Sequence, residues 1–236
     1  MSDLTEYGYA PGNELEAEFP ELTPARVTAV HRERYEIVSP YGEGYARLKG
    51  GVYYSGLSLE EYPTTGDFVL LQYNEKGDSQ IVRTLPRKSR FSRQDPDVGR
   101  GEQVVAANFD FVFILTSLNR DFNPRRLERY LTASWQSGAS PVIVLTKKDL
   151  VGECEQQQLE AERIAIGAPV FAVSAHTGEG IPALFPYLAC GKTVVFLGSS
   201  GVGKSSLVNA LAGNPCMKVS GIREEDSRGR HTTTHR

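Results

Sequence analysis

Four continuous apolar runs in the second half of the chain alternate with segments of helical periodicity. The runs FVFILTS, PVIVLT, PVFAVS and TVVFLG occupy residues 111–117, 141–146, 169–174 and 193–198. Uninterrupted runs of this length are typical of parallel strands covered on both faces. The intervening segments predict helices over 124–137, 153–166 and 204–212, the first with Leu127, Leu131, Ser134 and Trp135 on one face. We therefore expect a mostly parallel α/β domain over residues 104–236.

The first half of the chain shows a different pattern, of short strand-like segments separated by turn residues. Ser39-Pro40, Gly50-Gly51 and Gly66-Asp67 are among the turn signals between residues 26 and 83. Four or five short antiparallel strands in this span predict a small all-β barrel of the OB type over residues 25–88. Its aromatic side chains either pack the strands or form base-stacking platforms, and they are Tyr35, Tyr41, Tyr45, Tyr53, Tyr54, Phe68 and Tyr73.

Charge is unevenly distributed along the chain. The net charge is −3, but residues 1–22 carry six acidic side chains and no Lys or Arg. With Pro and Gly and little apolar periodicity, residues 1–24 predict an acidic, flexible leader. Residues 83–101 are locally basic, so we interpret 89–103 as a basic linker and consider a nucleic-acid partner.

The composition is that of a soluble globular protein, with 40% hydrophobic and 23% charged residues. No apolar run approaches the roughly 18 residues of a membrane span, and the amino terminus has no secretory signal. Cys154, Cys190 and Cys216 are widely separated, so they predict neither a disulfide framework nor a zinc site. We expect a cytoplasmic protein with no membrane contact.

The loop after the fourth apolar run carries the strongest chemical signal. It matches the phosphate-binding pattern G-x-x-x-x-G-K-[ST] and comprises Gly198, Ser199, Ser200, Gly201, Val202, Gly203, Lys204, Ser205 and Ser206. Glycines let the backbone N–H groups curl around phosphates, and the following helix presents its positive end. Lys204 can reach the β- and γ-phosphates, and the Ser205 hydroxyl can bind Mg²⁺.

Two further loops follow predicted strands and could form a base pocket. Thr146, Lys147, Lys148 and Asp149 follow the second run, and Ser174 and Ala175 follow the third. A carboxylate at Asp149 can accept from both guanine N1–H and the exocyclic amine, a donor pair that adenine lacks. Asp149 could instead merely cap the next helix, which leaves an adenine-nucleotide enzyme as an alternative.

The order of these motifs, together with the barrel before them, resembles the ribosome small-subunit-dependent GTPase A family. The motifs are TKKD, Ser174-Ala175, GSSGVGKSS, Pro86-Arg87-Lys88-Ser89, the segment Arg126–Tyr130 and the threonine-rich Gly229–Thr234. The resemblance implies a circularly permuted P-loop GTPase that binds GTP and Mg²⁺ and acts in late maturation of the small (30S) ribosomal subunit, which stimulates hydrolysis. We also expect the protein to be a monomer. It also implies a DxxG motif and a zinc-binding domain after residue 236, so no zinc ligands are expected among these residues.

The resemblance assigns further roles that spacing alone does not. One of Thr232, Thr233 and Thr234 would join Ser205 on Mg²⁺, although residues 228–236 could equally be a basic tail; His231 and His235 are weak candidates for positioning water. Contacts to 16S rRNA are expected from Arg87, Lys88, Arg90, Arg93, Arg125, Arg126 and Arg129. Arg125 and Arg129 could instead form solvated ion pairs with Glu128 on the helix predicted over residues 124–137. Without DxxG, a GTP- and RNA-binding module without turnover is the main alternative.

Overall fold

The computed structural model describes residues 3–32, 34–50, 59–94, 102–119 and 122–217. They form two compact units, one built from the described residues of 3–109 with 190–193 and the other from those of 110–189 and 194–217. The boundary near residue 109 lies beyond the expected linker. The expected linker, residues 89–103, includes the strand β6 (Arg90–Gln94) and the start of β7 (Glu102–Ala107), and these two strands pair antiparallel. The prediction of a linker differs from the structure because strand pairing between distant residues leaves no local signal.

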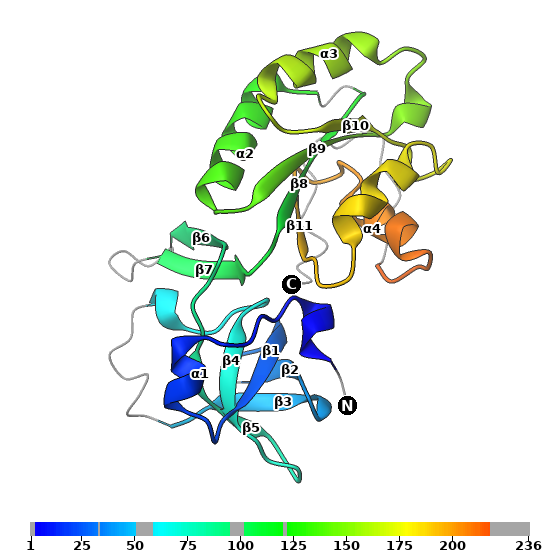
Figure 1. Cartoon of the computed structure of the whole chain (residues 1–236). Coiled ribbons are helices and arrows are strands. Elements are labelled where there is room, and N and C mark those ends of the chain that lie inside the picture. The colour runs from blue at the N-terminus through cyan, green and yellow to red at the C-terminus, as the bar shows by residue number, and fades with distance from the viewer. Residues whose placement is uncertain (1–2, 33, 51–58, 95–101, 120–121, 218–236) are drawn as a thin grey trace. The chain divides into compact units, whose positions relative to one another are not determined.

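The first unit contains a closed five-stranded barrel in the order β1-β2-β3-β5-β4 (Figure 1). Its strands are β1 (Thr23–Val30), β2 (Tyr35–Ser39), β3 (Gly42–Leu48), β4 (Phe68–Gln72) and β5 (Ser79–Thr84). Neighbours pair antiparallel except β3 and β5, which are parallel. The arrangement is consistent with the expected OB-type barrel. Alternate residues fill its interior, and these include Ala25, Val27, Ile37, Ala46, Val69, Leu71 and Ile81.

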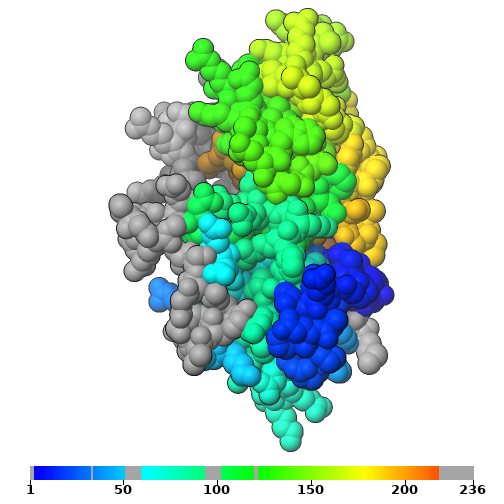
Figure 2. Space-filling model, turned by 60° about the vertical axis from the view of Figure 1, so that its left-hand side comes forward, coloured from blue at the N-terminus to red at the C-terminus, as the bar shows by residue number. Residues whose placement is uncertain are grey.

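The amino-terminal segment packs on this barrel, which differs from the prediction of a flexible leader. It contains the 3-10 turn η1 (Leu4–Tyr7) and the short helix α1 (Glu14–Glu18), each begun by a polar cap. Tyr9, Leu15, Phe19 and Leu22 pack against buried Phe68, Leu70 and Leu85 of the barrel. Figure 2 shows the segment in dark blue against the barrel surface. The prediction of a leader was based on the acidic side chains and did not use the i, i+4, i+7 spacing of Leu15, Phe19 and Leu22.

A buried ion pair joins Arg87, which follows β5, to Asp67, which immediately precedes β4. Both carboxylate oxygens of Asp67, which is 0% exposed, accept from the Arg87 guanidinium, at 2.8 and 2.7 Å. The same guanidinium also donates to the carbonyls of Tyr62, at 2.8 Å, and Glu60. Arg87 therefore joins the end of the barrel to the segment before β4. Its guanidinium makes four hydrogen bonds inside the protein, an environment that favours a structural role over the expected RNA contact.

The second unit is a parallel four-stranded sheet in the order β10-β9-β8-β11. Its strands are β8 (Phe111–Ser117), β9 (Ser140–Thr146), β10 (Val170–Ala172) and β11 (Val194–Gly198). Its helices are α2 (Pro124–Gln136), α3 (Glu155–Ile164) and α4 (Lys204–Ala212), and it also contains the 3-10 segments η3 (Lys148–Leu150) and η4 (Ile181–Leu188). A further 3-10 segment, η2 (Leu59–Glu61), belongs to the first unit. All four strands and all three helices predicted for this domain are present, with small shifts of their ends.

Helices cover both faces of this sheet (Figure 1). On one face Phe113, Val144 and Val202 join Leu184 of η4 and Leu207 of α4 in a single apolar core. α2 and α3 cover the other face. Trp135 was expected on the buried face of α2, but half of its side chain is exposed, because Ser134 and Leu131 take the inward positions. Among the residues that the structure describes, no helix is long and apolar enough to cross a membrane.

Candidate nucleotide-binding site

The three loops singled out in the sequence follow β9, β10 and β11 directly. Because parallel strands end at the same edge of a sheet, the loops 146–149, 174–175 and 198–206 share one edge of the second unit. β8 lies between β9 and β11, so one strand separates the loop expected to bind the base from the loop expected to bind phosphates. Bound ligands of open α/β sheets lie at this edge.

Glycines shape the loop between β11 and α4. A Cβ at Gly198 would lie 2.8 Å from the Leu115 carbonyl oxygen of β8, so the close approach of the two strands requires glycine. Gly201 and Gly203 have φ angles of +73° and +105°, in the left-handed region that disfavours side chains. α4 begins immediately afterwards at Lys204. The loop therefore curls directly into a helix amino terminus, as phosphate binding requires.

The Lys204 side chain folds back over this loop. Its Nζ donates to the carbonyls of Gly198, at 2.6 Å, and Ser199, at 2.7 Å. Burial lowers the pKa of the Lys204 ammonium. An ammonium that is partly removed from water and held only by neutral carbonyls gains from a nearby anion, so phosphate oxygens would be favourable additional partners.

Thr146 contacts the phosphate loop. Its hydroxyl donates to the Val202 carbonyl at 2.6 Å, and the side chain is only 5% exposed. A Cβ at Gly203 would lie 3.9 Å from this same side chain. Thr146 was assigned to the guanine pocket; in the structure its one hydroxyl proton is used on the phosphate loop, so it acts by joining the two loops.

Asp149 is held by the loop after β10. The buried Ser174 hydroxyl donates to Asp149 Oδ1 at 2.5 Å and accepts from the backbone N–H groups of His176, at 3.2 Å, and Thr177, at 3.1 Å. Ser174 is therefore a support for Asp149. Among the hydrogen bonds of the described residues, none uses the Ala175 backbone N–H. That donor and the exposed Asp149 carboxylate have the chemistry expected for guanine O6 and for the N1–H and amine.

The two lysines of this motif differ in environment. Lys147 has a φ of +62°, an uncommon conformation for a residue with a side chain, and is half-buried. Lys148 Nζ lies 2.6 Å from Glu179 Oε1, and this bond raises the pKa of Lys148. Lys148 was assigned to the base pocket, whereas its ammonium is paired with Glu179. No local pattern in the sequence marks Glu179 as a partner.

Sequence reasoning also missed the loop after β8. The Ser117 hydroxyl donates to Asn119 Oδ1 at 2.8 Å, and the Leu118 N–H donates to the Thr146 carbonyl at 3.0 Å. These bonds fix the loop between the base and phosphate loops. Its position after a strand of the same sheet was the available signal.

Ser205 is the residue of the expected Mg²⁺ site that lies among the described residues. Ser205 lies in the first turn of α4, next to Lys204, and its hydroxyl is a hard oxygen donor suited to Mg²⁺. Thr232, Thr233, Thr234, His231 and His235 lie outside the described residues. Within the described ranges, no three His, Cys, Asp or Glu side chains cluster as metal ligands. Because Mg²⁺ commonly keeps waters and binds substrate phosphates, a single Ser ligand here fits that ion.

The remaining basic residues assigned to RNA are mostly at the surface. Lys88, Arg90, Arg93, Arg125 and Arg129 are exposed, whereas Arg126 is half-buried. Arg90 pairs with Glu60 at 3.3 Å, and Arg93 donates to Gln103 at 3.0 Å. These contacts are weak enough at the surface to be exchanged for phosphates.

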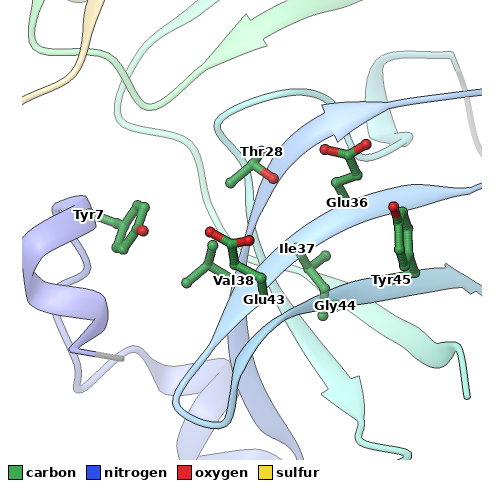
Figure 3. Close-up of a pocket in the computed structure, with 8 residues that line it drawn as sticks. All are labelled: Tyr7, Thr28, Glu36, Ile37, Val38, Glu43, Gly44 and Tyr45. Atoms are coloured by element: carbon green, nitrogen blue, oxygen red, sulfur yellow. The ribbon is translucent and has the colours of Figure 1, made fainter. Parts of the chain in front are cut away.

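The aromatic residues of the barrel that the structure describes are divided between its core and its surface. Tyr35 and Phe68 are core residues, whereas Tyr41, Tyr45 and Tyr73 are exposed, and Tyr53 and Tyr54 lie outside the described residues. Tyr41 and Tyr73 stack on each other with ring centroids 4.3 Å apart. A hollow of about 290 Å³ on β1 to β3 is lined by the carboxylates of Glu36 and Glu43 beside Tyr45 (Figure 3). Those carboxylates would repel RNA phosphates.

Comparison with known proteins identifies relatives over most of the chain. A family model described as RsgA GTPase matches residues 84–236. The small ribosomal subunit biogenesis GTPase RsgA 1 of Listeria monocytogenes is 49% identical over 211 residues, which cover 89% of this chain and 59% of that protein. The RsgA of Methanosarcina acetivorans is 42% identical over 212 residues, covering 89% and 56%. The chain thus spans about three-fifths of the length of these relatives.

Solved structures show the same architecture. YjeQ from Thermotoga maritima matches with a TM-score of 0.68 at 28% identity, covering 84% of this chain and 67% of that one. YloQ, a circularly permuted GTPase, matches with a TM-score of 0.57 at 22% identity, covering 81% and 65%, and supports the fold alone. The base loop precedes the phosphate loop along this chain, which is the permuted order. The chain therefore belongs to the RsgA GTPase family.

Proposed function

We propose that this chain binds guanine nucleotides and hydrolyses GTP to GDP and phosphate. The observation that carries the proposal is the joining of three loops at one sheet edge: Thr146 bonds the phosphate loop, and Ser174 bonds Asp149. Lys204 and the N–H groups of residues 200–206 would hold the phosphates, and Asp149 with the Ala175 N–H would hold guanine. Thr146 and Ser174 would position these groups.

In the proposed reaction, water attacks the γ-phosphorus in line with the leaving β-phosphate oxygen. Lys204 would neutralise charge that develops on the β- and γ-phosphate oxygens, where its half-buried ammonium lacks an anionic partner among the described residues. Ser205, with one of Thr232, Thr233 and Thr234, would hold Mg²⁺, which supplies further charge neutralisation when bound. Binding without turnover remains the alternative that a hydrolysis assay decides.

We further propose that nucleotide state controls association with the small ribosomal subunit during its maturation in the cytoplasm, and that the protein acts as a monomer. The names of the relatives and the exposed basic residues Lys88, Arg90, Arg93, Arg125 and Arg129 support the proposed association with the small subunit. Phosphate contacts would give affinity for 16S rRNA that falls steeply with salt. Arg87 is excluded from this set because Asp67 binds it.

Lys204→Ala tests the phosphate site, with Lys192→Ala as a lysine control outside the phosphate loop. We expect loss of GTP binding in titration calorimetry for the first variant only. A single-turnover assay of GTP hydrolysis with and without small subunits then separates hydrolysis from binding alone, and ATP competition tests the adenine alternative. Near-normal GTP affinity in Lys204→Ala would contradict the site assignment.

A further inference from the structure

An ion pair between Lys148 of the TKKD motif and Glu179, which lies outside the recognised motifs, joins the two loops of the base site. Lys148 Nζ and Glu179 Oε1 are 2.6 Å apart, with the lysine side chain one-third exposed and the glutamate about half exposed. Lys148 is the neighbour of Asp149 along the chain, and Glu179 lies five residues beyond Ser174. The pair therefore bridges the segment that carries the base-recognising carboxylate and the segment that supports it.

Backbone bonds hold both partners of this pair in place. The Lys148 N–H donates to the Val173 carbonyl at 3.1 Å, and the Glu179 carbonyl accepts from the Ser174 N–H at 2.9 Å. Thr177 Oγ1 accepts from the Glu179 N–H at 3.4 Å. Glu179 thus closes a turn around Ser174 by its backbone, while its side chain reaches the other loop. The same residue contacts both halves of the base site.

The base loop needs such support because its backbone is strained. Lys147 has the left-handed φ of +62°, a conformation that residues with a Cβ rarely adopt. Strained backbone persists only where neighbouring contacts hold it. Local bonds from the Leu150 and Val151 N–H groups to the Lys147 and Lys148 carbonyls close the turn itself. The contacts that join residues 147–149 to the loop after β10 are the Lys148 N–H bond, the Ser174 to Asp149 bond and the Lys148–Glu179 pair. Of these, the ion pair alone uses the side chain of a residue outside the recognised motifs, Glu179.

We propose that Glu179 is a positioning residue for guanine recognition. Its carboxylate fixes Lys148, and through it the strained turn that sets the direction of the Asp149 carboxylate. Without the pair, the turn relaxes and Asp149 spends less time in the orientation that accepts from guanine N1–H and the amine. The phosphate loop is untouched, because Lys148 and Glu179 make no bond to it. This inference rests on the proposed guanine site.

The test compares GTP with inorganic tripolyphosphate, which can occupy the phosphate loop but has no base. Glu179→Gln keeps the size of the side chain and removes its charge. We expect GTP affinity in titration calorimetry to fall by about two- to fivefold, the range of a partly exposed ion pair, while tripolyphosphate affinity stays unchanged. Lys148→Met should give the same loss, and the double variant no more than either single variant. Lys148→Arg, which keeps the pair, should retain wild-type affinity.

Arg47→Gln is the matched control, because it removes an exposed ion pair with Asp78 on the barrel and should change neither affinity. The inference is overturned if Glu179→Gln binds GTP as the wild type does, if both ligands weaken equally, or if the two single losses add. If the wild-type chain does not prefer GTP over ATP, the proposed function is overturned as well. If Glu179→Gln keeps the wild-type preference for GTP over ATP, only this inference is overturned.

Discussion

The Thr146 hydroxyl donates to the Val202 carbonyl at 2.6 Å, so the first residue of the base motif holds the loop that would bind phosphates. Thr146→Val keeps the shape of this buried side chain and removes the donor, leaving a carbonyl unpaired. We expect the affinities for GTP and for GDP to fall by the same factor, about five- to tenfold, since one buried hydrogen bond contributes about 1 kcal/mol. Titration calorimetry with both nucleotides measures this.

Thr146→Ser is the control, because serine keeps the hydroxyl and should lose much less affinity. A loss confined to GTP, or no loss in Thr146→Val, would show that the bond does not support the phosphate loop in solution.

The Asp67–Arg87 pair should be essential for the stability of the barrel. Arg87→Ala leaves the fully buried Asp67 carboxylate without its main partner, which typically costs about 3–5 kcal/mol of unfolding free energy. Urea unfolding followed by hydrogen exchange of the β1 and β4 amides localises the effect. Arg90→Ala, which removes an exposed pair with Glu60, should change stability by less than about 1 kcal/mol. Equal effects of the two substitutions would contradict the structural role of Arg87.

Tyr35 should make the barrel sensitive to alkaline pH. Burial raises the pKa of its phenol to about 12, from an ordinary value of 10.0. The folded state therefore keeps the proton that the unfolded state releases, so this contribution is complete below pH 10 and is lost as pH rises to about 12. It amounts to roughly 2–3 kcal/mol of unfolding free energy at most. Tyr35→Phe should flatten the pH dependence of urea unfolding in this range; parallel curves for the two proteins would refute the prediction.

The amino-terminal segment should resist proteases. Phe19 packs on the barrel beside Leu15, and the Arg83 guanidinium lies 5.0 Å from its ring centroid. Phe19→Ser removes this partly buried ring. We expect the free energy with which the segment packs on the barrel to fall by about 1–2 kcal/mol, and cleavage within residues 3–22 to become faster. Limited proteolysis with mass spectrometry measures the rate, with exposed Glu18→Gln as the control. A wild-type segment cleaved as fast as the variant would indicate that it does not pack.

The sequence predicted the second unit closely because its signals are local. The run at residues 111–117 coincides with β8, and α2 begins where Asn123 caps it and Pro124 occupies its first turn. The glycine spacing of residues 198–203 reflects backbone conformations and a close strand contact that only this residue type satisfies. Except for the contact of Gly198 with Leu115 of β8, these features are decided by neighbours along the chain.

The features that were missed depend on residues far apart in the sequence. Arg87 looks like other surface arginines until Asp67, twenty residues earlier, is placed against it. Glu179 and Lys148 are separated by thirty-one residues and share no motif. The leader was misread because composition describes its exposed acids and says nothing about the few apolar side chains that pack.

The most direct test of the account is the base preference of Asp149→Asn. Guanine offers two donors to a carboxylate, whereas xanthine has a carbonyl in place of the amine and matches an amide. Titration calorimetry should show that the wild type prefers GTP over XTP and that Asp149→Asn reverses this order, with tripolyphosphate binding unchanged. An unchanged preference for GTP in Asp149→Asn would contradict the assignment of this sheet edge as a guanine nucleotide site.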